Sequence, residues 1–345
     1  ASDLDARAAD PYVGGRSSDA VVRPADVRAH SGPLARPAPC FLRTTLGLDR
    51  SSPVGAGIGV AVIDSGLHPS AEFIGRIGAF YDLTGGGFVR TAPYDDYGHG
   101  THVAGLIAAS GITSGLRFQG VAPGVRLSVF KVLDDQGEGR TSDVVRAIEF
   151  IVANRHALGV DLINLSLGHP VLEPAATDPL VQAIERASRA GLVVVTAAGN
   201  FGMNPSTGEP GYAGITSPGN APSAITVGAL LTNGTVRRSD DGVAPFSSRG
   251  PTWYDAFAKP DILAPGDRLV SVGVPGTTLY DAFPSLQVSG RFGGSFLRLS
   301  GTSMATEVAS GVAALALDAS RHHSAASGRW AAWSTRPAMS ANALK

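Results

Sequence analysis

Three short segments of the sequence each combine one reactive side chain with small neighbours. Asp64 ends the apolar run in VAVIDSG (60–66), and Gly66 lets the chain turn sharply behind it. His99 stands between two glycines in GHGTHVAG (98–105), so backbone and ligand can approach the imidazole closely. Ser303 lies in GTSMAT (301–306), directly before an apolar helical stretch. Taken singly, each has an ordinary structural alternative: a turn cap, a buried histidine or a helix cap.

Taken together, the three side chains fit one reaction. A serine hydroxyl is a poor nucleophile until a base removes its proton, and that base must be oriented and its charge balanced by a carboxylate. Asp64, His99 and Ser303 supply these roles, and the helix expected after Ser303 would favour a developing negative charge at its N-terminus. His102, three residues after His99, is expected to be structural, because it would point elsewhere on the helix. A metal site of His99 and His102 is the weaker alternative, since histidine ligands on a helix prefer a spacing of four with a carboxylate.

The elements that must position these residues follow from the apolar pattern. Continuous apolar runs, typical of strands covered on both faces, occupy 58–64, 125–133, 160–167, 192–198 and 224–230. One intervening helix is predicted around 144–152, with Ser142 as its cap. A second is predicted from Asp178 and Pro179 to about Gly191. This alternation predicts a doubly wound α/β fold with a mainly parallel sheet sandwiched by helices.

In content and order, the three segments resemble the catalytic motifs of the subtilisin-like serine peptidases (subtilases, peptidase family S8). A fourth segment, VVVTAAGN (193–200), also matches and ends in Asn200. INLSLG (163–168), FSSRGP (246–251) and KPDILAPG (259–266) are similar to further family motifs, and the resemblance extends over 42–318. YDDYGHGTH and SPGNAPSAITVGA (217–229) are most similar to the bacterial AprX-like branch.

The resemblance implies a three-layer α/β/α fold and a serine endopeptidase that cuts extended polypeptides through an acyl-enzyme. It implies that Asn200 and the Ser303 backbone N–H form the oxyanion hole. The cleft would be lined by Ser166, Leu167, Gly168, Ala197, Ala198 and Gly199, with Gly137, Glu138 and Gly139 as an edge strand pairing with substrate. Because the pocket residues are small or apolar, broad or apolar preference before the cut bond is expected.

Glu138 leads to a separate hypothesis about specificity. Its carboxylate, beside the cleft, would favour a basic substrate residue further upstream. The alternative is a solvated loop carboxylate without such a role.

The sequence departs from the family pattern at Glu307, where the family usually has proline. A glutamate is tolerated near a helix N-terminus, but it adds a carboxylate one turn from Ser303. This supports an alternative function, a catalytically impaired subtilase that binds peptides. Structural calcium is common in the family, but 108–120 lacks the usual acidic loop, so no metal site is assignable. No cofactor is required for the chemistry.

Composition restricts the function classes further. Lys and Arg number 28 against 29 Asp and Glu, so the net charge of −1 gives no general attraction for nucleic acid. No apolar run approaches the roughly 20 residues of a membrane helix. Cys40 is the only cysteine, which excludes an internal disulfide. A nucleotide-binding alternative, suggested by GAGIG (55–59), is disfavoured because this glycine run precedes its strand instead of following it.

The chain is expected to comprise an N-terminal extension (1–41), a catalytic domain (42–321) and an irregular tail (322–345). The extension is predicted to be a loosely packed arm, too short for the family's inhibitory propeptide, which is therefore expected to be absent from this chain. Protein or peptide substrates are the predicted partners of a monomer. No signal peptide is visible, yet secretion is expected from the resemblance, with an intracellular location as the alternative.

Overall fold

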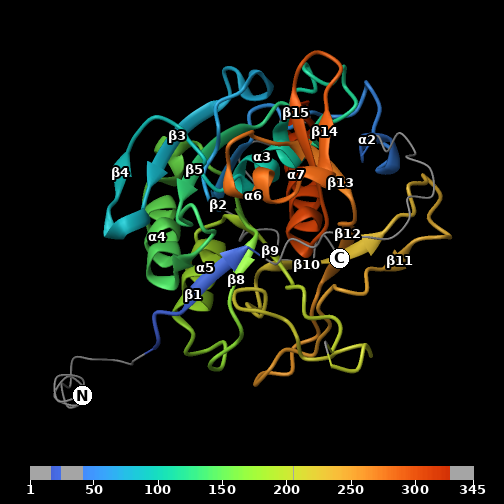
Figure 1. The fold of residues 1–345 in the computed structure, drawn as a ribbon. Helices are drawn as coiled ribbons and strands as arrows, with labels where there is room; N and C mark the ends of the chain where they lie inside the picture. Colours follow the sequence, from blue (N-terminus) through green and yellow to red (C-terminus); the bar gives the residue numbers. More distant parts are fainter. Residues whose placement is uncertain (1–16, 25–41, 205, 327–345) are drawn as a thin grey trace.

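The computed structural model describes residues 17–24, 42–204 and 206–326. Within these residues, the largest sheet has nine strands in the order β11-β10-β9-β7-β2-β5-β3-β4, with β12 also paired to β10 (Figure 1). Its strands are parallel except where β4 joins β3 and β11 joins β10. They are β2 (Gly59–Asp64), β3 (Ile77–Asp82), β4 (Val89–Arg90), β5 (Arg126–Lys131), β7 (Leu162–Leu165), β9 (Val193–Ala197), β10 (Ile225–Leu231), β11 (Gly242–Val243) and β12 (Ile262–Pro265).

Helices cover both faces of this sheet (Figure 1). α3 (His99–Ala108) and α7 (Thr302–Ala326) pack together on one face, and α4 (Thr141–Leu158) and α5 (Pro179–Arg189) on the other. Alternate residues of β2 therefore enter different cores: Val60 and Val62 join the α3 and α7 side, whereas Ala61 and Ile63 join the α4 and α5 side. This explains the continuous apolar runs and confirms the predicted α/β/α class.

Smaller elements surround this frame. A three-stranded sheet has the order β13-β15-β14, and another has the order β6-β1-β8. The strands are β1 (Val21–Pro24), β6 (Gly139–Arg140), β8 (Leu167–Gly168), β13 (Leu269–Val272), β14 (Gln287–Ser289) and β15 (Ser295–Leu299). The short helices are α2 (Leu42–Thr45), η1 (Ala71–Phe73), η2 (Thr84–Gly86), α6 (Thr278–Ala282) and η3 (Pro284–Leu286).

The two predicted helices differ in how they begin. α5 starts as expected, with the Asp178 carboxylate accepting from the backbone N–H groups of Leu180 and Val181. The prediction that Ser142 caps α4 is wrong. α4 begins at Thr141, and Asp19 accepts from both the backbone N–H and the hydroxyl of Ser142, each at 2.9 Å. A carboxylate from over 120 positions away thus supplies the cap.

The N-terminal arm is not loosely packed where the structure describes it. Val21–Pro24 form β1, the middle strand of the sheet with β6 and β8. Val22 is fully buried, and the Ala20 carbonyl accepts from the backbone of Thr141 at 2.9 Å. Cys40 lies outside the described residues.

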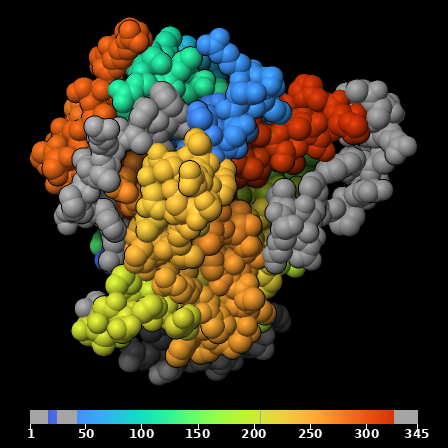
Figure 2. Space-filling model, turned by 90° about the vertical axis from the view of Figure 1, so that its right-hand side faces the viewer, coloured from blue at the N-terminus to red at the C-terminus, as the bar shows by residue number. Residues whose placement is uncertain are grey.

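α7 continues to Ala326, so the first residues of the predicted irregular tail, 322–326, are helical. Near its end, Asp318 accepts from the backbone N–H groups of Gly55 and Ala56, at 2.9 and 3.0 Å. Figure 2 shows the red end of α7 beside the blue segment that includes these residues. Two N–H groups of the GAGIG loop therefore bind a carboxylate of the chain itself, which argues further against a nucleotide there. None of the helices in the described ranges could span a membrane.

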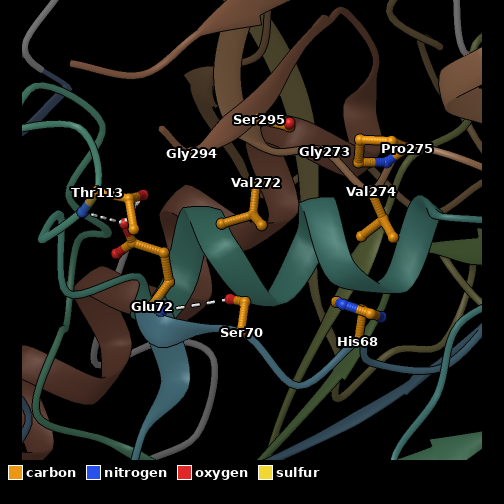
Figure 3. A pocket seen from close by; sticks show the side chains of 10 residues that line it. All are labelled: His68, Ser70, Glu72, Thr113, Val272, Gly273, Val274, Pro275, Gly294 and Ser295. Atoms are coloured by element: carbon orange, nitrogen blue, oxygen red, sulfur yellow. Dashed lines mark hydrogen bonds between the residues drawn. The ribbon is translucent and has the colours of Figure 1, made fainter. Parts of the chain in front are cut away.

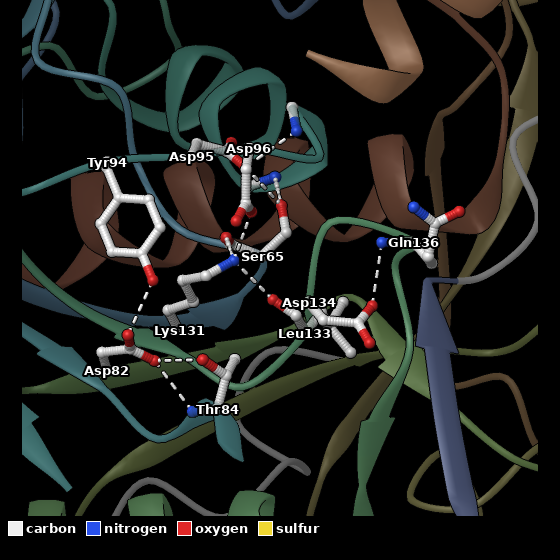
Figure 4. A network of polar contacts seen from close by, with 12 residues as sticks. Ser65, Asp82, Thr84, Tyr94, Asp95, Asp96, Lys131, Leu133, Asp134 and Gln136 are labelled. Atoms are coloured by element: carbon white, nitrogen blue, oxygen red, sulfur yellow. Dashed lines mark hydrogen bonds and ion pairs between the residues drawn. The ribbon is translucent and has the colours of Figure 1, made fainter. Parts of the chain in front are cut away.

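A buried lysine ties together strand ends at the edge of the sheet beside Ser65, the residue that follows Asp64 (Figure 4). Lys131, at the end of β5, donates to the Asp96 carboxylate at 2.6 Å and to the carbonyls of Ser65 and Leu133 at 2.8 and 2.7 Å. Its side chain is 1% exposed. The ammonium therefore fixes the turn after Asp64 to the end of the neighbouring strand.

Replacing Lys131 with methionine should destabilise the fold by about 2–4 kcal/mol, because two buried carbonyls lose their donor. The free energy of unfolding in urea measures this. Arg186→Met is the control, since it removes only an exposed ion pair with Glu149 and should cost at most about 1 kcal/mol. Equal losses in the two variants would contradict the role given to Lys131.

Candidate active site

Asp64 and His99 meet where β2 ends and α3 begins. The Asp64 Oδ1 atom lies 2.8 Å from His99 Nδ1, and both side chains are fully buried. His99 Nε2 has no hydrogen-bond partner among the described residues, so this nitrogen can take a proton. Burial lowers the pKa of His99, but the charge and hydrogen bond of Asp64 outweigh burial, and the net pKa is raised.

The start of α3 is held by residues that the sequence motifs did not single out. Asp95 accepts from the backbone N–H groups of Gly98 and Thr101, both at 2.8 Å. Ser65 donates to Asp95 at 3.0 Å and accepts from the Gly100 N–H at 2.8 Å. A Cβ on Gly100 would lie 2.2 Å from the Gly66 carbonyl oxygen, so glycine is required for α3 to approach β2 this closely. The pair Asp95 and Asp96, directly before Tyr97, is the feature of the sequence from which this role of Asp95 could have been predicted.

Ser303 occupies the second position of α7, as expected of a serine at a helix N-terminus. Its hydroxyl donates to the Ser166 carbonyl at 3.0 Å. Asn200 Oδ1 accepts from the backbone N–H of Thr302 at 2.9 Å and from its hydroxyl at 3.0 Å. The oxygen end of the Asn200 amide is therefore turned toward Thr302, and the start of α7 is tied to the loop after β9.

The cleft segments lie on either side of β1. β6 contains Gly139 and follows Gly137 and Glu138, whereas β8 contains Leu167 and Gly168 and follows Ser166. Val22 pairs with Gly139 on one side, and Arg23 pairs with Gly168 on the other.

β1 also runs toward Ser303. Arg23 and Pro24 pair with Gly168 and Leu167 in turn, so β1 runs toward Ser166 and Ser303. The middle strand position that the resemblance assigns to substrate is thus filled by the chain itself.

The predicted pocket walls come together at the start of α7. Ala197 ends β9, and Ala197 and Ala198 are buried. The Gly199 N–H donates to the Thr302 hydroxyl at 3.2 Å. A Cβ on Gly199 would lie within 2.8–3.1 Å of Thr216 and Ser248 side-chain atoms, so only glycine fits this wall.

Glu307 lies inside the site, because α7 turns its side chain toward β7 and β8. It is fully buried, and its Oε1 accepts from Asn164 Nδ2 at 3.2 Å and from the Ser166 hydroxyl in a shorter bond. Burial raises the pKa of Glu307 to about 8. Asn164 was not singled out from the sequence, although it lies in the INLSLG motif.

His102 has the structural role expected of it. Its Nε2 lies 3.0 Å from the Leu297 carbonyl, and burial lowers the pKa of this histidine to about 3. The described residues contain no group of three His, Cys, Asp or Glu side chains placed to hold a metal. A calcium site therefore stays unassigned.

The Glu72 carboxylate anchors residues 110–113, which lie in the segment 108–120 discussed above for calcium (Figure 3). Glu72 accepts from the Gly111 N–H at 2.6 Å, the Thr113 N–H at 2.9 Å and the Ser110 hydroxyl at 2.9 Å. Burial disfavours its ionisation, but these hydrogen bonds outweigh burial and lower the pKa of Glu72.

Replacing Glu72 with glutamine should cost about 1–3 kcal/mol at neutral pH, because glutamine keeps only one acceptor oxygen and donors on the other side would face its NH2 group. A carboxylate with a lowered pKa stabilises the fold above its ordinary pKa of 4.5, and this contribution is lost as pH falls through the lowered value. The stability gap between wild type and Glu72→Gln should therefore shrink in acid, as measured by denaturant unfolding at several pH values. A gap independent of pH would contradict this, and Glu209→Gln, at an exposed position, is the control.

Comparison with known proteins identifies the family to which this chain belongs. A family model described as the subtilase family matches residues 55–342. The chain is 42% identical over 268 residues to "Serine protease AprX" of Bacillus subtilis (strain 168), covering 76% of this chain and 57% of AprX. It is 36% identical over 265 residues to "Subtilisin DY" of Bacillus licheniformis, covering 76% and 77%. The solved structure of "Sphericase" superposes with a TM-score of 0.65 at 29% identity, covering 90% and 88%. The chain therefore belongs to the subtilase family.

Proposed function

We propose that this protein is a serine endopeptidase that holds an extended polypeptide as the middle strand between β6 and β8. The observation that carries the proposal is β1, a segment of the chain itself that lies in this position and runs toward Ser303. Binding by strand addition uses main-chain hydrogen bonds, so many sequences can be accommodated. The family relationship and the buried Asp64–His99 pair support the activity.

The proposed reaction begins when the Ser303 hydroxyl turns from the Ser166 carbonyl to His99 Nε2. His99 takes its proton as the oxygen attacks the substrate carbonyl, and Asp64 holds the imidazole through Nδ1 and stabilises the imidazolium. Asn200 and the Ser303 N–H stabilise the oxyanion at the start of α7. His99 then protonates the leaving amine, and water hydrolyses the acyl-enzyme. Because His99 must be neutral and its pKa is raised, activity should fall as pH decreases through a value above 6.5.

The arm suggests a consequence for the intact chain. Because β1 fills the substrate position, it should compete with substrate until it leaves the cleft. We propose that the arm is itself a substrate of the enzyme.

The predicted secretion and monomeric state remain predictions.

A peptide-library digest read by mass spectrometry, with wild type and Ser303→Ala, tests the function. Only wild type should cut peptides and react with a fluorophosphonate, and only wild type should shorten its own N-terminus, as seen in the intact mass. Peptide binding by wild type without cutting or labelling would instead support the impaired, peptide-binding subtilase.

Arg23 bears on the specificity proposed for Glu138. Its Nε and Nη2 atoms donate to Glu138 Oε1 at 3.0 and 2.5 Å. Consider a substrate that pairs with β8 in the register of β1. Its residue opposite Ser166 would lie beside Ser303 as the first residue before the cut bond, and its residue opposite Gly168 would be the third. We propose that Glu138 favours a basic residue there.

Glu138→Gln should lower kcat/KM for a peptide with arginine at that third position, relative to the same peptide with alanine. The effect should be a few-fold, at most about fivefold, because the Arg23 and Glu138 side chains are 61% and 46% exposed. Asp134→Asn, on the same turn, is the control for a general change of charge. An unchanged ratio for Glu138→Gln would identify Glu138 as a solvated carboxylate.

A further inference from the structure

Glu307 is placed where its charge state matters to the cleft wall. It follows Ser303 by one turn of α7 and is fully buried. Its Oε1 binds the Ser166 hydroxyl, while the Ser166 carbonyl accepts from the nucleophile at 3.0 Å. Ser166 is thus held by α7 at two points, through its side chain and through its carbonyl.

The neighbouring amide is oriented by a further bond. Ser310, one turn beyond Glu307 on the same helix, donates to Asn164 Oδ1 at 2.7 Å. The nitrogen end of Asn164 must therefore face Glu307, where it donates at 3.2 Å. Both neutral neighbours on the strand side donate to the same carboxyl oxygen, Oε1.

The second carboxyl oxygen of Glu307, Oε2, makes the ionised form of this side chain unfavourable. Glu307 Oε2 is buried and has no hydrogen-bond partner among the described residues. An uncharged carboxylic acid tolerates such surroundings better than a carboxylate, whose charge is shared by both oxygens. The ionisable groups that act on it are Asp64 at the end of β2, which opposes ionisation, and His99 at the start of α3, which favours it. Burial dominates, and the pKa of Glu307 is raised well above its usual range.

We propose that Glu307 is a positioning residue that works as an uncharged acid, fixing Ser166 beside the nucleophile, and that its ionisation sets an alkaline limit to activity. In the uncharged form the hydrogen bonds to Ser166 and Asn164 hold the wall at the spacing that Ser303 requires. Once ionised, Oε2 needs donors that the described part of the chain does not supply, so the wall must shift or admit water. This inference rests on the proposed function.

The test is the pH profile of kcat/KM for a short chromogenic peptide, measured for the full chain from pH 5 to 11 and normalised to each enzyme's maximum. Wild type should lose activity above about pH 8, to roughly a tenth one pH unit higher. Glu307→Gln keeps an uncharged acceptor of the same size and should lack this decline. The loss of activity at low pH, which His99 sets, should persist in this variant. Glu149→Gln, which changes an exposed carboxylate on α4, should show the wild-type profile.

An alkaline decline that persists in Glu307→Gln, or that wild type does not show, would overturn the proposal. A merely structural role would alter unfolding stability in Glu307→Gln without removing one limb of the profile. A second measurement does not depend on catalysis. Infrared difference spectra of Ser303→Ala against Ser303→Ala with Glu307→Gln should show a protonated carboxylic acid at pH 7 that disappears by pH 10. If that signal is present but wild type is inactive, the proposed function fails while the uncharged state of Glu307 stands.

Discussion

The buried hydrogen bond between Asp64 and His99 is the contact on which the rest of the site depends. A carboxylate and an imidazole that have no contact with solvent must form hydrogen bonds with each other. β2 and the first turn of α3 must therefore bring Asp64 Oδ1 within 2.8 Å of His99 Nδ1. The surrounding polar groups serve that meeting. Asp95 and Ser65 hold the N-terminus of α3, and Lys131 fixes the turn after Asp64. The carboxyl edge of the sheet is therefore a continuous hydrogen-bonded frame.

The proposed substrate cleft is built on a different principle. β6 and β8 are two short strands with a strand-wide gap between them, and their main-chain groups need a partner. In this chain the partner is β1, which is held additionally by Arg23 on Glu138 and by Asp19 on Ser142. The same groups would bind substrate, so occupancy by the arm and recognition of peptides share one set of contacts.

Glu307 shows how a departure from a family pattern can be absorbed by the fold. On the sequence, a carboxylate one turn after the nucleophile suggested impairment. In the structure it is enclosed by Ser166 and Asn164, and burial favours its uncharged form. The position that commonly holds a rigid proline here holds a hydrogen-bonding group that links α7 to the cleft wall.

The sequence by itself determined the fold class, the five central strands and the Asp178 cap of α5. It predicted Asp64, His99 and Ser303 as a triad, and the structure joins Asp64 to His99. These are local properties: apolar runs report burial on two faces, and the motifs place reactive groups at strand and helix ends. It could not determine that Asp19 caps α4, that β1 fills the cleft, or that Glu307 binds Ser166. Each of these contacts joins residues more than 100 positions apart. Such pairings depend on which buried groups lack partners once the chain has folded, and only the tertiary structure decides that.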